Sequence, residues 1–130
     1  MALVLNEEQR LLQDTAKDFL SKYAPIASLR KLRDEHNPIG YDPALWLQMT
    51  EMGWASVILP EAYGGLEFGF LGLGVVLEES GRTLTASPLF ASAVVGASAV
   101  LLGGSEQQKQ MLLLQIASGD LTLALALEES

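Results

Sequence analysis

Glycine and proline divide this chain into segments of unequal length, and several of these segments carry apolar residues at helical spacing. Two segments begin with a capping box, in which a polar residue is followed three positions later by glutamine, at Asn6–Gln9 and Ser105–Gln108. Two others begin with a polar residue directly before proline, at Asp42 and Ser87. Such starts, each followed by a glycine or proline stop, favour a helical fold for most of the chain.

These signals predict an all-α fold, an orthogonal bundle of about five to six helices. The five clearest helices run from about Asn6 to Tyr23, from Pro43 to Met52, over the Leu73–Gly81 pattern, from Pro88 to Gly103 and from Ser105 to Gly119. A short charged stretch around Leu29 and Leu32 predicts one or two further helical turns.

The end of the chain changes character. Leu121–Leu127 alternates large and small residues over the length of a strand, so we expect a single β-strand there. A strand without a partner leaves its backbone donors and acceptors unpaired. The chain therefore divides into a helical unit, residues 1–120, and a truncated strand, residues 121–130. The strand either pairs with another copy or begins a further domain.

Charge and composition exclude several classes of protein. With 16 acidic and 8 basic residues the net charge is -8, which repels phosphate backbones and anionic lipids, so we expect no nucleic acid and no membrane as partner. The absence of cysteine excludes disulfides and thiolate sites and agrees with a cytoplasmic location. The apolar start, Met1–Leu5, is too short for a signal peptide.

The longest uncharged stretch runs from Leu84 to Ser105. Its apolar part, Leu89–Leu102, is shorter than the roughly 20 residues that a membrane span needs. We interpret it as a helix buried in protein.

Residues that could carry catalysis are few. The single histidine, His36, stands in a charged loop and is expected at the surface, and no set of metal ligands is present. Glu78 and Glu79 are neighbours on a helix, so they point about 100° apart and cannot face each other as a carboxylate pair. The glycines of the Gly69–Gly74 segment lack the spacing of a dinucleotide-binding loop. We predict no catalytic residue and no metal site in this chain.

Small side chains recur every four residues along the uncharged helix, at Ser87, Ala91, Val95 and Ala99. This stripe has two explanations that the sequence leaves open. It is either a surface for close helix packing or one wall of an apolar pocket.

Four segments, in this order, resemble the amino-terminal helical domain of the acyl-CoA dehydrogenases: Met52–Trp54, Leu59–Gly65, Val75–Glu79 and Gly104–Lys109. Members of that family have a helical front domain, a middle β-domain and a carboxyl-terminal helical domain. They bind FAD and remove the α and β hydrogens of an acyl-CoA thioester. The resemblance implies that residues 121–130 are the truncated first strand of the β-domain.

The resemblance also implies site residues. Ser87, Ala91 and Val95 match positions that line the acyl cavity, and their small size suggests a cavity wider than a straight chain needs. Leu125, Leu127 and Glu128 match the flavin-contacting end of the first strand. A threonine is usual where Glu128 stands, so backbone contacts from the two leucines are better supported than contact through Glu128. The family's catalytic base is a glutamate of the carboxyl-terminal domain, and no glutamate here inherits that role.

Two functions remain open at this point. The first is the amino-terminal domain of an FAD-dependent acyl-CoA dehydrogenase, acting on acyl-CoA within a homo-oligomer and unable to retain FAD or to catalyse as this fragment. The alternative is a non-enzymatic helical module for assembly or acyl binding. Whether the chain is itself part of an enzyme is left undecided by its residues.

Overall fold

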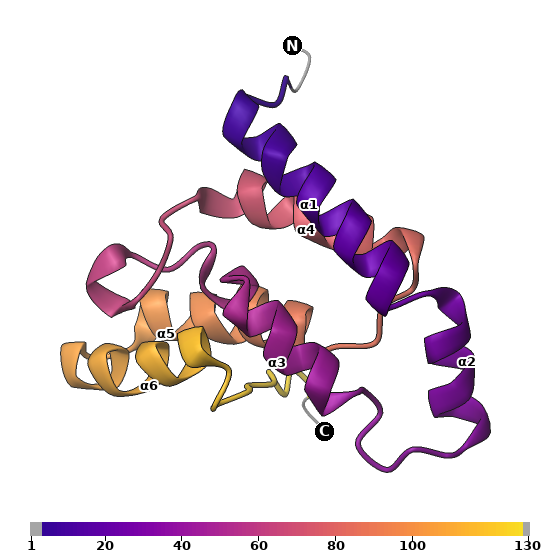
Figure 1. Ribbon diagram of the computed structural model, residues 1–130. Helices are drawn as coiled ribbons and strands as arrows, with labels where there is room; N and C mark the ends of the chain where they lie inside the picture. The colour runs from indigo at the N-terminus through magenta and orange to yellow at the C-terminus, as the bar shows by residue number, and fades with distance from the viewer. Residues whose placement is uncertain (1–3, 129–130) are drawn as a thin grey trace.

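The computed structural model describes residues 4–128, and this part of the chain is all-α, without a strand (Figure 1). Six α-helices are joined by two 3-10 turns and one π-helix. The elements are α1 (Glu7–Tyr23), α2 (Ile26–Asp34), α3 (Pro43–Glu51), the 3-10 turns η1 (Trp54–Ser56) and η2 (Glu61–Tyr63), α4 (Gly69–Arg82), the π-helix η3 (Phe90–Gly96), α5 (Ala97–Gly103) and α6 (Glu106–Ser118). The predicted fold class is confirmed.

Three of the four caps predicted from the sequence are present, at Asn6, Asp42 and Ser105. The fourth, Ser87, is not the cap of the π-helix, which begins after Leu89 without a side-chain cap. Asn6 Oδ1 accepts a hydrogen bond from Gln9 N at 2.8 Å, and Gln9 Oε1 accepts one from Asn6 N at 3.0 Å. The same reciprocal pair of bonds joins Ser105 and Gln108 at the start of α6. Asp42 accepts from the amide of residue 44 at the start of α3. Each cap satisfies amides that the first helical turn leaves unpaired.

The helices form two packed groups (Figure 1). In the first group α1 lies along α4, and α3 continues into η1 beneath them. In the second, η3 and α5 form one continuous rod that packs against α6, which also contacts η1 and η2. Helix α2 stands at the side of the molecule and contains no buried residue. None of the described helices is long and apolar enough to cross a membrane.

Trp54 lies at the centre of the first group. Its side chain is 1% exposed, and the ring of Phe19 meets it edge-on at 5.4 Å between centroids. Ala16, Met49 and Val76, from α1, α3 and α4, belong to the same buried cluster. Burial of this apolar surface is the main source of stability for a helical domain of this kind.

A second buried cluster joins the loop after η1 to the second group. Leu59 is fully buried with Ala97, Leu113 and Ile116, from α5 and α6. Ile58 packs against both clusters and connects them.

The predicted strand over Leu121–Leu127 is wrong. No other strand exists among the described residues to supply the partner that a β-ladder requires. This segment instead lies on the helices, where Leu121 N donates to Gln115 O at 3.1 Å and Leu123 N donates to Ser92 Oγ at 3.3 Å. Residues 129–130, which belonged to the predicted strand unit, lie outside the described residues.

The predicted helix from Pro88 to Gly103 is correct in extent but not in type. Its first half, Phe90–Gly96, is a π-helix, in which each residue bonds to the fifth rather than the fourth residue before it. The spacing of apolar residues does not distinguish an α-helix from a π-helix. In both, residues four positions apart in sequence lie close together on the same side of the helix. Helix α4 begins at Gly69, earlier than the Leu73 pattern indicated.

We expect Gly65→Ala to destabilise the domain strongly. A β-carbon at this position would overlap the carbonyl oxygen of Leu59, which accepts a hydrogen bond from Glu67 N at 2.9 Å. The loss should be about 2 kcal/mol or more in a urea unfolding experiment. The matched control is Gly74→Ala, on the exposed side of α4, where an added β-carbon meets nothing within 4 Å. It should raise stability by about 0.5–1 kcal/mol. Equal effects of the two substitutions would contradict the close approach at Gly65.

Candidate functional site

The predicted acyl-cavity residues lie along one edge of the rod formed by η3 and α5. Ser87 is in the bend before η3, and Ala91 and Val95 are in η3; all three side chains are half-buried. Ser87 Oγ accepts a long hydrogen bond from Leu89 N at 3.4 Å. Because four residues make slightly less than one π-turn, Ala91 and Val95 keep adjoining positions on one side.

The fourth residue of the stripe, Ala99, lies in α5 and is exposed. It lines a groove of about 360 Å³ between α5, the start of α6 and residues 123–125. Three glycines, Gly96, Gly103 and Gly104, are among the residues that line this groove, together with apolar side chains such as Val100 and Leu112.

The predicted flavin-contacting residues lie at the end of the described chain. Leu125 is 51% exposed and lines the same groove as Ala99, whereas Leu127 is 77% exposed and lies beyond it. Glu128 is also exposed. The structure thus brings Leu125 beside Ala99, the last residue of the small-residue stripe. It does not bring Leu127, Glu128 or any of the predicted acyl-cavity residues, Ser87, Ala91 and Val95, to that groove.

Backbone groups of this tail are available for a ligand. Among the described residues no backbone hydrogen bond is formed by any amide or carbonyl from Ala124 to Glu128. Exposed main-chain donors and acceptors of this kind can bond the polar edge of a planar ring.

Two residues near the tail were missed by sequence reasoning. Ser92 is fully buried, and its hydroxyl accepts the amide of Leu123. At Gly96 an added β-carbon would stand 2.5 Å from the β-carbon of Leu123. The sequence signal for Ser92 was a polar residue within an otherwise apolar helix, because a buried hydroxyl needs a hydrogen-bond partner.

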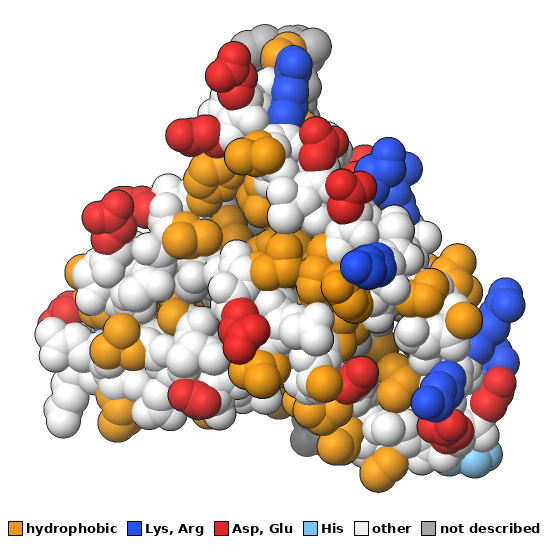
Figure 2. Space-filling view, viewed as in Figure 1, with side chains coloured by type: hydrophobic (Ala, Val, Ile, Leu, Met, Phe, Trp, Pro, Cys, Tyr) orange, Lys and Arg blue, Asp and Glu red, His pale blue; other side chains and the backbone are white. Residues whose placement is uncertain are grey.

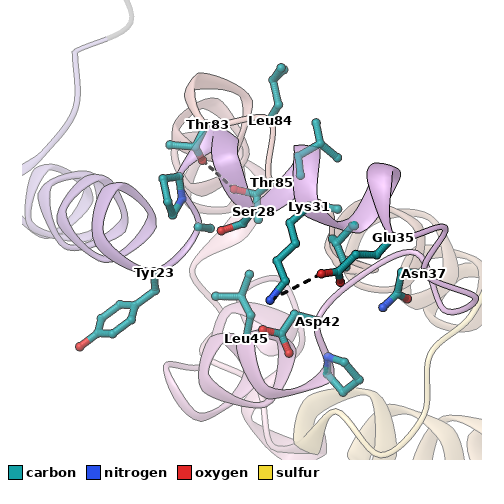
Figure 3. A pocket seen from close by; sticks show the side chains of 16 residues that line it. Tyr23, Ser28, Lys31, Glu35, Asn37, Asp42, Leu45, Thr83, Leu84 and Thr85 are labelled. Carbon is teal, nitrogen blue, oxygen red and sulfur yellow. Dashed lines mark hydrogen bonds and ion pairs between the residues drawn. The ribbon is translucent and has the colours of Figure 1, made fainter.

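A separate cavity of about 360 Å³ opens between α2, the start of α3 and the loop after α4 (Figure 3). Lys31 Nζ lies 4.0 Å from Glu35 Oε1 at this cavity, and the hydroxyls of Thr83 and Thr85 are 2.7 Å apart. None of the six predicted site residues lines it.

A third groove, of about 510 Å³, is mainly apolar and lies between α1 and the loop that follows η1. Leu11, Trp54, Leu66 and Phe68 line it, with Glu8 at one end. In Figure 2 hydrophobic side chains are exposed along α1 and between it and the helices below.

The two adjacent glutamates of α4 occupy different environments. Glu78 is exposed, whereas Glu79 is 2% exposed, and its Oε2 lies 2.9 Å from Arg82 Nε without the alignment of a hydrogen bond. The two carboxylates therefore do not form a facing pair, which agrees with the expectation from helical geometry. The described residues contain no cluster of three or more acidic or histidine side chains that could hold a metal ion, and His36 is exposed.

Comparison with known families decides the relationship. Residues 6–120 match the model of the family described as acyl-CoA dehydrogenase, N-terminal domain. This chain belongs to that family. The resemblance noted in the sequence is therefore confirmed over most of the chain.

Individual relatives agree with the family. The acyl-CoA dehydrogenase IpdE2 of Mycolicibacterium smegmatis is 30% identical over 108 residues, which is 82% of this chain and 34% of that protein. A variant of the Tcur3481-Tcur3483 steroid ACAD is 35% identical, with a TM-score of 0.84, over 95% of this chain and 33% of the other. The ChsE4-ChsE5 complex from Mycobacterium tuberculosis has the same TM-score of 0.84, with 27% identity over 95% and 34% of the two chains.

This acyl-CoA dehydrogenase N-terminal domain spans about a third of the length of these relatives. The family match, residues 6–120, contains the stripe, whereas the groove described above also includes residues 123–125, which lie beyond that match.

Two of the segments that carry the family resemblance meet through one hydrogen bond. Tyr63 Oη donates to Glu106 Oε1 at 2.6 Å, which joins η2 to the start of α6. This bond to the carboxylate, with smaller contributions from desolvation and from the negative charge, raises the pKa of Tyr63 above its ordinary value. The folded domain therefore holds the phenol proton more tightly than the unfolded chain does. The stabilising effect is present at neutral pH and is lost as pH rises above the usual tyrosine range.

We expect Glu106→Ala to lower the pKa of Tyr63 towards its ordinary value, because both the acceptor and the charge are removed. The measurement is an ultraviolet titration of tyrosinate, with Tyr63→Phe used to subtract the other two tyrosines. Glu61→Ala, which removes an exposed carboxylate two residues before Tyr63 in η2, is the control and should leave the titration unchanged. An unaltered Tyr63 titration in Glu106→Ala would show that the bond does not persist in solution.

Proposed function

We propose that this chain is the amino-terminal domain of an FAD-dependent acyl-CoA dehydrogenase and supplies a wall of the acyl pocket and part of the flavin site. The observation that carries this proposal is the groove in which Ala99, at the end of the small-residue stripe, lies beside Leu125 of the tail. Substrate and flavin must be adjacent for dehydrogenation, and in this groove Leu125 lies beside Ala99, four residues after Val95 of the predicted acyl wall. The family match supports the same assignment.

The pocket wall favours bulky acyl groups. Ser87, Ala91 and Val95 are small and only half-buried, so each keeps an accessible face on which an acyl chain could lie. The similarity to a steroid ACAD, at 35% identity, supports a substrate larger than a straight chain. These residues would contact the acyl chain through dispersion and the exclusion of water.

The tail fits a flavin through its backbone. The main-chain groups of Leu125 and Leu127 are free of hydrogen bonds to other described residues and can bond the ring edge. FAD, when bound, would accept the hydride that leaves the acyl chain. The carboxylate of Glu128 beside the ring would oppose negative charge there, so we assign the contact to the backbone of the leucines and only weakly to Glu128.

This domain supplies binding surfaces and no proton chemistry. Residues 1–120 form the helical domain in this proposal, and residues 121–130 begin the next domain; the family match, which ends at residue 120, supports that boundary. The base that removes the α proton would then come from a part of the protein beyond these residues. Assembly as a homo-oligomer is part of the proposal, and the similarity to the ChsE4-ChsE5 complex supports association.

The alternative function is a non-enzymatic module that binds acyl groups or assembles with other chains. The exposed apolar side chains of Leu11, Leu102 and Leu127 are the observation in its favour, since uncovered apolar surface marks interaction sites. Flavin retention separates the two functions.

We expect the 130-residue chain, purified with excess FAD, to retain no flavin and to oxidise no acyl-CoA, because most of a flavin-binding surface is absent from it. The product of the complete gene should retain FAD and reduce it when acyl-CoA is added. The measurement is flavin absorbance after gel filtration, before and after the addition of substrate. Stoichiometric FAD on the 130-residue chain would contradict the first expectation, and a complete gene product without flavin would favour the non-enzymatic module.

We expect Ala91→Phe, in the complete enzyme, to obstruct bulky or branched acyl groups. Steric overlap in a pocket of this kind should reduce kcat/KM for large substrates about ten- to a hundredfold. Short acyl chains should be affected much less.

The control is Ala27→Phe, at an exposed position of α2 away from the stripe, which should leave both substrate classes unchanged. Thermal unfolding of each variant distinguishes the pocket from simple helix packing. If Ala91→Phe melts several degrees lower and loses all substrates equally, the stripe belongs to the core and the pocket assignment fails.

A further inference from the structure

We propose that Ser92 and Gly96 are positioning residues, which hold Leu123 on the π-helix and so set the path of residues 124–128 towards the flavin. The flavin part of this inference rests on the proposed function. The seating of Leu123 does not, because it follows from contacts within the described chain.

The first contact is a hydrogen bond between residues 31 positions apart in sequence. Ser92 is fully buried, and its Oγ accepts from Leu123 N at 3.3 Å. Serine within a helix commonly bonds back to a carbonyl of the preceding turn, as Ser80 Oγ does to Val76 O at 3.0 Å. The hydroxyl of Ser92 instead receives an amide of the tail, so this side chain links the helix to the segment that leaves it.

The second contact is a close approach that only glycine allows. A β-carbon on Gly96 would stand 2.5 Å from Leu123 Cβ, 3.1 Å from its Cδ1 and 3.2 Å from the carbonyl oxygen of Ala91. The backbone φ of Gly96 is -64°, which every residue type adopts readily, so the backbone conformation does not require glycine here. Glycine is required because any side chain at this position would overlap Leu123.

These two contacts define where the tail is held and where it is free. Leu121 N bonds to Gln115 O, and Leu123 N bonds to Ser92 Oγ. The amides of Thr122 and Ala124 have no hydrogen-bond partner among the described residues. Leu123 is therefore the last fixed point before the residues proposed to meet the flavin, and a shift there would displace all of them together.

The seating of Leu123 is tested in the 130-residue chain by amide hydrogen exchange. In the parent chain the Leu123 amide should exchange about tenfold more slowly than those of Thr122 and Ala124, after correction for intrinsic rates. Ser92→Ala and Gly96→Ala should remove this protection. The matched control is Ser98→Ala, which removes a buried hydroxyl without a partner from the adjoining helix α5 and should leave it intact. Protection that persists in Ser92→Ala and Gly96→Ala would overturn the seating.

The role in positioning is tested in the complete gene product loaded with FAD. Ser92→Ala should weaken FAD binding about five- to tenfold and Gly96→Ala by tenfold or more, and both should shift the flavin reduction potential. Ser98→Ala should change neither quantity. The flavin reduction potential separates a positioning role from a purely structural one. A substitution that only destabilises the fold lowers the thermal stability but does not alter the environment of the bound flavin.

A compensating pair guards against a variant that fails to fold. Gly96→Ala combined with Leu123→Gly removes both clashing leucine atoms and should recover folding. The flavin potential should stay altered, because the leucine side chain that packs against residue 96 is gone and only the hydrogen bond to Ser92 Oγ still holds residue 123. If Leu123 loses its protection but FAD affinity and potential match the parent, the positioning role is overturned. If the complete gene product binds no flavin at all, the flavin role falls with the proposed function, and the exchange result still decides the seating.

Discussion

Burial of Trp54 is the packing interaction on which the rest of this domain depends. Its indole ring lies in a cluster to which α1, α3 and α4 all contribute, with Phe19 meeting it edge-on. The ring is placed there by the turn at Gly53, whose φ of 82° is a left-handed conformation that glycine adopts without strain. Removing a buried tryptophan side chain typically costs about 3–5 kcal/mol. That is a large part of the roughly 5–15 kcal/mol that holds a domain folded.

The irregular segment after Trp54 transmits this packing to the second half of the fold. Three backbone hydrogen bonds fasten it, from Leu66 N to Ser56 O, from Phe68 N to Val57 O and from Glu67 N to Leu59 O. It therefore behaves as ordered structure even though it contains little helix. Because Leu59 lies in the second cluster, the rod of η3 and α5 takes its position from the same segment that positions Trp54.

The proposed site lies at the far end of this chain of contacts. The π-helix carries the small side chains of Ala91 and Val95 and receives Leu123 beside Gly96, and Ala99 of the stripe lines one groove with residues 123–125. π-Helical turns are rare and occur frequently at functional sites.

Local signals in the sequence were sufficient for the helices. Capping boxes at Asn6 and Ser105 and apolar spacing are properties of a few neighbouring residues, so helix ends and the all-α class could be predicted from them. The four family segments likewise identified the domain, since their order is visible along the chain. The absence of a facing carboxylate pair on α4 followed from helical geometry alone.

Only the tertiary structure determined the conformation of Leu121–Leu127 and showed that the helix on which this segment packs is a π-helix. Alternating large and small residues favour an extended backbone, but a strand exists only when a second strand accepts its hydrogen bonds, and none is present among the described residues. The use of Ser92 as an acceptor and of Gly96 as space for Leu123 likewise joins residues about thirty positions apart. A sequence records such partners separately, whereas the packing of the folded chain brings them together.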